Sequence, residues 1–295
     1  MKTLKAITGE FIGTFLMCFC GIGAVAVASL FGAMSGPGEI GLVWGFTIAI
    51  AIYVTRHLSY AHFNPAVSVA MIVGGRMKLR ELPAYLVGQF AGAFVAGLAL
   101  WGLFADSVTK WIGDNGVTMM AKSSASSIWC EVFPNNSAAI VSNVTGAFAE
   151  GLGVFILVLV IFSLTEKANI GRPSTHLAPL FIGLTITVLI GTIGPLTNAG
   201  LNPARDLGPR LVGLMVGFGN LAFSWDVILV YTVGPLVGGA LAALVYTKIL
   251  EPMHIKCANH TDKPCDPSAK HCTHSADEPC DKIASQAFEA ENGQI

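Results

Sequence analysis

The feature that most constrains this chain is a series of long segments without a charged residue. Four of them are especially long, and they lie between Glu10 and Glu39, between Glu81 and Asp106, between Arg172 and Arg205, and between Asp226 and Lys248. A helix needs about 20 predominantly apolar residues to cross a bilayer, and each of these segments is long enough. The sequence therefore predicts a helical protein that crosses a membrane several times.

The composition excludes other classes. Of 295 residues, 53% are hydrophobic and only 12% are charged, whereas soluble proteins have about 25% charged residues. Lys and Arg number 17 and Asp and Glu number 18, so the chain has no general basic character for binding nucleic acid. The apolar content also excludes disorder for most of the chain.

The apolar pattern predicts six full spans and two shorter segments. The spans are expected at about 6–31, 40–57, 82–104, 145–166, 177–195 and 227–250. The segments at about 65–74 and 203–216 are too short to cross a membrane. Such half-spans are tolerated where their free backbone ends are buried or face a water-filled cavity.

The two halves of the chain repeat. Glu10 precedes Asn64 by nearly the same interval that separates Glu150 from Asn202, and Gly45 and Gly183 precede the same two asparagines by equal intervals. Each half has three spans, an odd number, so the second copy must be inverted in the bilayer. We expect an all-α polytopic membrane protein with six transmembrane helices and two re-entrant half-helices. Residues 1–250 form the channel domain, with repeats at about 5–125 and 145–250.

Positive charge predicts the orientation. Seven basic residues fall on one side of the predicted bundle: Lys2, Lys5, Arg76, Lys78, Arg80, Lys167 and Arg172. The other side holds only Lys110 and Lys122. Because cytoplasmic loops are enriched in Lys and Arg, both termini are expected in the cytoplasm of a protein of the plasma (inner) membrane. The loop at roughly 105–144 is expected to lie over the outer mouth.

The two half-spans begin with the same triplet, Asn64-Pro65-Ala66 and Asn202-Pro203-Ala204. Asn is a favoured N-cap and Pro a favoured first helical residue. Each triplet therefore starts a half-helix in mid-membrane, and two such N-termini place positive dipole ends at one point. Amide donors there can bind a hydroxyl or water oxygen, while cations are repelled and proton relay is disfavoured.

With these triplets, the sequence resembles the major intrinsic protein superfamily over about residues 5–250. Four residues, Asp206, Arg210, Pro235 and Leu236, match positions typical of its glycerol-conducting branch. The resemblance implies an aquaporin-like channel without a cofactor. It also implies a homotetramer in which each copy has its own pore.

The resemblance also implies a selectivity filter near the outer side. By position its residues are Trp44, Ile190, Ala199 and Arg205, although a shift of one residue would place Gly191 in the filter instead of Ile190. Arg205 is expected to be the lone strong cation at membrane depth. Bacterial glycerol facilitators have Gly and Phe in place of Ile190 and Ala199. This set of four is similar to that of plant nodulin-like intrinsic proteins, which implies glycerol and metalloid acids as solutes.

Three ionisable residues are expected to support the pore loops. Glu10 and Glu150 stand on the first span of each half. They either relay protons or accept backbone N–H groups of the re-entrant loops, and their symmetric placement favours the second role. His62 is expected to fix its loop rather than to bind a metal.

The tail, residues 251–295, has a different composition. It holds four cysteines in a short repeat, Cys257 and Cys265, then Cys272 and Cys280. This spacing lacks the tight pairs of structural zinc sites. A disordered cytoplasmic tail is expected, with a soft-metal or metalloid site as the alternative.

We therefore expect a passive channel, not an enzyme, for glycerol, water and other small uncharged solutes, extending to urea and neutral metalloid acids. The expected partners are these solutes and the lipid bilayer, with no nucleic acid. Two alternatives remain. One is a coupled secondary transporter of a small solute, and the other is a membrane-anchored soft-metal or metalloid-binding protein that acts through its tail.

Overall fold

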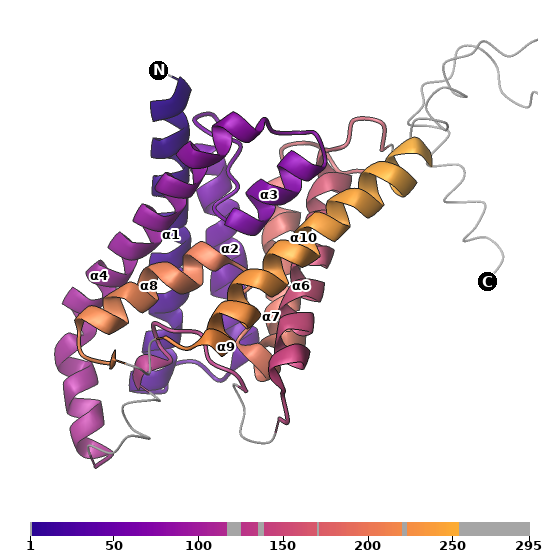
Figure 1. The fold of residues 1–295 in the computed structure, drawn as a ribbon. Helices are drawn as coiled ribbons and strands as arrows, with labels where there is room; N and C mark the ends of the chain where they lie inside the picture. Colours follow the sequence, from indigo (N-terminus) through magenta and orange to yellow (C-terminus); the bar gives the residue numbers. More distant parts are fainter. Residues whose placement is uncertain (1, 117–124, 135–138, 170, 220–222, 254–295) are drawn as a thin grey trace, which may run out of the picture.

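The computed structural model describes residues 2–116, 125–134, 139–169, 171–219 and 223–253, and these form a helical bundle (Figure 1). Six of its helical segments are long and apolar enough to cross a membrane. The tail expected at 251–295 lies outside the described residues from 254 onward.

The long helices occupy the predicted spans. Five are continuous: α1 (Lys2–Phe31), α2 (Pro37–Thr55), α4 (Leu82–Asp114), α6 (Asn143–Thr165) and α7 (Ala178–Thr197). A single turn of 3₁₀ helix, η1 (Leu79–Glu81), precedes α4. The sixth segment alternates helix types: α9 (Trp225–Ile228), the π-helix η3 (Leu229–Val233), α10 (Gly234–Val245) and the π-helix η4 (Tyr246–Leu250).

Helix α4 ends at Asp114, well beyond the predicted end of that span at 104. The added turns are amphipathic: Val108 is buried, and Trp111 and Ile112 pack against the core. On the exposed face, Lys110 pairs with Asp114 one turn further on at 2.5 Å. The extension is therefore stabilised by packing on one face, although its charged residues break the apolar run from which spans are predicted.

Two short helices lie among the long ones, α3 (Pro65–Val73) and α8 (Pro203–Met215) (Figure 1). Each begins at the Pro of its triplet, with the preceding Asn as N-cap. Helix α3 packs mainly on α10, and α8 on α4. Each half-helix thus rests on the third long helix of the other half, as an inverted repeat requires.

The long helices cross at glycines. The main contacts are α1 with α4, α6 with α10, and α2 with α7. Where α2 meets α7, a Cβ added to Gly45 would lie 2.6 Å from the carbonyl oxygen of Gly183, and one added to Gly183 would lie 2.1 Å from that of Gly45. These two glycines occupy equivalent positions of the repeat. Their missing side chains allow the backbones to touch, as is typical of packing in lipid.

Candidate functional site

The loop before each half-helix is held in an unusual conformation by a buried carboxylate. Before α3, Ala61 and Phe63 have positive φ angles of 54° and 52°. Glu10 on α1 is fully buried and accepts hydrogen bonds from the backbone N–H groups of His62 at 3.0 Å and Phe63 at 2.7 Å. The Ser59 hydroxyl and the Gln89 amide donate to it as well, at 2.7 and 2.8 Å. A left-handed backbone costs energy in residues other than glycine, and this set of bonds keeps it in place.

The second half repeats this arrangement. Asn198, Ala199 and Leu201 have positive φ angles. Glu150 on α6 accepts from the N–H groups of Gly200 at 3.0 Å and Leu201 at 2.5 Å, and from the Thr197 hydroxyl. Both carboxylates therefore bind loop backbone. The sequence left two roles open, proton relay and acceptance of backbone N–H groups. This geometry is that of the second role.

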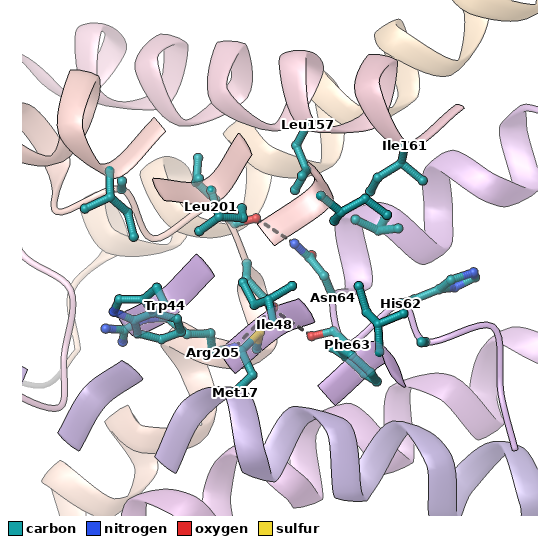
Figure 2. Close-up of a pocket in the computed structure, with 18 of the residues that line it drawn as sticks. Met17, Trp44, Ile48, His62, Phe63, Asn64, Leu157, Ile161, Leu201 and Arg205 are labelled. Carbon is teal, nitrogen blue, oxygen red and sulfur yellow. Dashed lines mark hydrogen bonds between the residues drawn. The ribbon is translucent and has the colours of Figure 1, made fainter. Parts of the chain in front are cut away.

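The two Asn residues meet head to head at the helix starts. The Asn64 side-chain oxygen accepts from Ala66 N–H at 2.8 Å, while its amide donates to the Leu201 carbonyl at 2.8 Å (Figure 2). Asn202 is bonded in the same way to Ala204 N–H at 3.0 Å and to the Phe63 carbonyl at 2.8 Å. An amide nitrogen has two hydrogens, so one N–H of each side chain is left over for the cavity.

A cavity of about 860 Å³ passes this point and is lined from both ends of the bundle. One end is lined by Ser29 and Pro37 and the other by Arg76 and Glu166. Its wall is largely aliphatic, from residues that include Met17, Ile48, Val67, Leu157 and Ile161. The loop residues 61–63 and 198–201 also line it. The cavity thus has apolar walls together with a row of polar backbone.

The four residues expected in the filter all line this cavity: Trp44, Ile190, Ala199 and Arg205. The Arg205 guanidinium lies 5.0 Å from the centre of a Trp44 ring, and the two stand together on one side of Asn64, with His62 on the other (Figure 2). Ile190 is buried and lines the cavity, whereas Gly191 is exposed and is not among the described residues that line it. Of the two alternatives for this position, only Ile190 therefore faces the cavity.

The sequence did not indicate the acidic residue that pairs with Arg205 at the cavity wall. Glu131, in the segment between α4 and α6, forms an ion pair with Arg205 at 2.5 Å, and its side chain is only 2% exposed. Glu131 is the one acidic residue between Asp114 and Glu150. It follows the apolar run Ile128-Trp129-Cys130, a signal that could have indicated burial. Burial raises the pKa of Glu131 to about 7, although the neighbouring Arg205 lowers it.

The expectation of a lone cation at membrane depth is therefore wrong. Arg205 is paired, and Arg210, five residues further along α8, is fully buried. Arg210 donates to Asp206 at 2.7 Å. Buried charges are stable only when they are paired. Here Glu131 pairs with Arg205, and Asp206 pairs with Arg210.

The residues typical of the glycerol-conducting branch lie behind the cavity. Asp206 accepts from the backbone N–H of Glu131 at 3.2 Å, and Arg210 donates to the carbonyl oxygen of Glu131. The Asp206–Arg210 pair therefore fixes the backbone of the residue that reaches Arg205. Pro235 is buried at the start of α10, and Leu236 packs against the core.

The last candidate in the described residues, His62, lines the cavity and is held by its neighbours. His62 is buried, its Nδ1 lies 3.1 Å from the Ser68 hydroxyl, and its ring lies 4.7 Å from that of Tyr85. Among the described residues, no group of three His, Cys, Asp or Glu is placed to hold a metal ion. Cys257, Cys265, Cys272 and Cys280 lie outside the described residues.

These features define a class of protein: a multi-pass membrane channel whose pore lies between two half-helices of an inverted repeat. The family model for the major intrinsic protein family matches residues 1–246, and the chain belongs to this family, whose members are facilitators rather than enzymes.

Individual relatives agree with this. The chain is 37% identical to the glycerol uptake facilitator protein of Escherichia coli (strain K12), over 87% of this chain and 92% of that protein. It is 35% identical to the propanediol uptake facilitator PduF of Salmonella typhimurium, over 83% and 93%. The X-ray structure of the aquaglyceroporin from Plasmodium falciparum superimposes with a TM-score of 0.74 at 28% identity, covering 86% of this chain and 99% of that one. The chain is a channel of the glycerol-facilitator type.

Proposed function

We propose that this protein conducts glycerol, water and other small uncharged solutes passively, and that it excludes ions and protons. The observation that carries the proposal is the cavity lined from both ends of the bundle, by aliphatic side chains and by the polar loops before the two half-helices. A polyol has a carbon edge and a hydroxyl edge, and this wall offers a surface for each. The names of the glycerol and propanediol facilitators support the same class of solute.

Filter residues set the solute range in this proposal. Trp44 and Ile190 provide the apolar side, and Ala199 leaves room that a larger side chain would fill. That room extends the range to urea and to neutral metalloid acids such as arsenous acid. Charged solutes are excluded because an ion that loses its hydration here finds no matching partner.

The Asn triplets exclude cations and protons. Asn64 and Asn202 cap two half-helices whose N-termini carry partial positive charge. A water molecule bound by both amide groups is poorly oriented to pass a proton along the file. Glu10 and Glu150 support this region by fixing the loops.

Topology and assembly complete the proposal. Residues 1–250 form the channel domain, both termini are cytoplasmic, and the protein resides in the plasma (inner) membrane. Four copies assemble, and because one chain lines the whole described cavity, each copy has its own pore. The tail from 251 onward lies on the cytoplasmic side.

Stopped-flow light scattering on proteoliposomes tests the function. Glycerol should enter protein-containing vesicles much faster than protein-free ones, without saturation and without an ion gradient. Saturable uptake that depends on a gradient would support a coupled transporter instead. Water flux without glycerol flux would overturn the proposal.

A further inference from the structure

The inverted repeat gives each residue of the filter a counterpart in the other half of the chain. The counterpart lies at the interval that separates Asn64 from Asn202, which is also the interval between Gly45 and Gly183 at the helix crossing. The counterparts of the four filter residues are all aliphatic: Ile52, Ala61, Val67 and Ile182. All four line the cavity, and we call them the aliphatic ring.

Local geometry supports this correspondence. Ala61 and Ala199 both have positive φ angles, 54° and 58°, and each lies in the loop before a half-helix. Ile52 and Ile190 are both buried, at 8% and 7% exposed. In an inverted repeat, a twofold axis in the plane of the membrane relates the two sets of residues. The aliphatic ring therefore lies on the opposite side of Asn64 from the filter.

The crossing of α2 and α7 separates the two sets. Trp44 and Ile182 each precede by one residue the glycine at which these helices touch. The helices are antiparallel, since Tyr53 near the end of α2 donates to the carbonyl oxygen of His176 just before α7. Side chains of a helix lean toward its N-terminus. Trp44 and Ile182 therefore lean in opposite directions along the pore.

The two sets differ in polarity. Ile and Ala occupy equivalent positions in both sets, but the ring has Val67 where the filter has Arg205, and Ile182 where the filter has Trp44. The guanidinium and the indole N–H can donate hydrogen bonds to a solute. No side chain of the ring can donate or accept one.

An aliphatic wall affects water and polyols differently. A water molecule has no apolar surface, so at this wall it loses hydrogen bonds without a compensating contact. A polyol can turn its carbon edge to the ring, while its hydroxyls bond to the backbone of loop residues 61–63, which also line the cavity. Apolar constrictions in channels restrict the passage of water by dewetting.

We propose that Ile52, Ala61, Val67 and Ile182 form a second filter, and that this aliphatic ring determines the ratio of water flux to polyol flux. The inference rests on the proposed function and assigns further specificity-determining residues of the same pore. A hydroxyl placed in the ring should raise water flux relative to glycerol flux, because it bonds to water but meets the carbon edge of the polyol.

Two variants at one position separate polarity from size. Thr and Val have nearly the same shape and differ by a hydroxyl in place of a methyl group, so Ile182→Thr and Ile182→Val remove a similar volume. The measured quantity is the ratio of osmotic water flux to glycerol flux in the same proteoliposomes, by stopped-flow light scattering, after subtraction of the fluxes through protein-free vesicles. The ratio for Ile182→Thr should exceed that for Ile182→Val by about twofold to tenfold, the effect expected of one net hydrogen bond.

The matched control places the same hydroxyl on α7 away from the pore. Val188 is 62% exposed and is not among the described residues that line the cavity, so Val188→Thr should keep the wild-type ratio. Ile52→Thr and Ile52→Val repeat the comparison on α2 and do not depend on the folding of an α7 variant. The ratio should change there in the same direction. Because both fluxes pass through the same pores, the ratio does not depend on the amount of reconstituted protein.

The outcomes distinguish this inference from the proposed function. A wild type that conducts no small solute would overturn the proposed function. A wild type that conducts glycerol, with equal ratios for the Thr and Val variants, would overturn the inference and leave the function standing. An increase in Val188→Thr as large as that in Ile182→Thr would also overturn the inference, since the effect would not come from the ring.

Discussion

At the scale of single residues, the filter combines a cation, its counter-ion and apolar side chains. The ion pair of Arg205 with Glu131 leaves this part of the cavity without net charge when Glu131 is ionised. Trp44 covers one face of the guanidinium. Removing Arg205 therefore takes away the positive charge and also leaves the buried Glu131 without its counter-ion.

Arg205→Ala should make the channel leak cations. Without Arg205, the positive charge that repels cations is lost and Glu131 has no counter-ion, and breaking a buried pair in this way also costs roughly 3–5 kcal/mol of stability. Potassium flux into proteoliposomes, followed with a fluorescent indicator, measures the leak. The double variant Arg205→Ala/Glu131→Gln should leak less. If Arg205→Ala vesicles conduct water and are as tight to potassium as protein-free ones, Arg205 does not exclude cations.

Ala199→Phe should narrow the solute range. The side chain of Ala199 lines the cavity, so a benzyl ring there fills space that a polyol uses. We expect flux of a four-carbon polyol to fall by about tenfold, equivalent to ~1.4 kcal/mol in the barrier, with water flux little changed. Swelling rates for a series of polyols measure the effect.

The control for this change inserts the same ring on the far side of α7. A Cβ at Gly191 meets nothing within 4 Å, so Gly191→Phe should leave the solute range unaltered. An Ala199→Phe channel with the wild-type range would mean that residue 199 does not border the narrowest point.

At the scale of elements, paired features of the two repeats hold the half-helices in place. Glu10 and Glu150 each bind two consecutive backbone N–H groups of the loop before a half-helix. The Asn caps then join the two loops across the centre. Close crossings at glycine bring the long helices near enough for these contacts to form.

Gly183→Ala should destabilise the bundle at the crossing of α2 and α7. The added Cβ would lie 2.1 Å from the carbonyl oxygen of Gly45, and relief of such a clash typically costs about 1–3 kcal/mol. The fraction of soluble protein after heating in detergent measures it. Gly191→Ala on the same helix is the matched control and should be neutral or slightly stabilising, because its Cβ enters open space. Equal stability of the two variants would contradict the close approach.

At the scale of the whole molecule, the cavity wall that the structure describes is formed by residues between 17 and 251. Of the described residues that line the cavity, the last is Glu251. Deletion of residues 254–295 should therefore leave glycerol flux within about twofold of the full-length value, because the described wall of the cavity is kept. Stopped-flow measurements normalised to the amount of reconstituted protein test this. A large change in flux would assign the tail a role in conduction.

The sequence alone determined the six spans, the two half-helices and their inversion, because the bilayer imposes a minimum length on apolar segments and the Asn-Pro-Ala triplets mark helix starts. These features depend on local composition and order. The positions of Trp44, Ile190, Ala199 and Arg205 followed from the resemblance to a family.

Only the tertiary structure decided which charges meet. Glu131 and Arg205 lie far apart in the sequence, in a polar loop and a half-helix, and no periodicity connects them. The tertiary structure also decided which face of α7 borders the cavity. Successive residues of a helix differ by about 100° in direction, so Ile190 lies in the cavity and Gly191 lies outside it. Long-range packing placed the acid beside the base, because a guanidinium buried in an apolar wall is stable only with a partner.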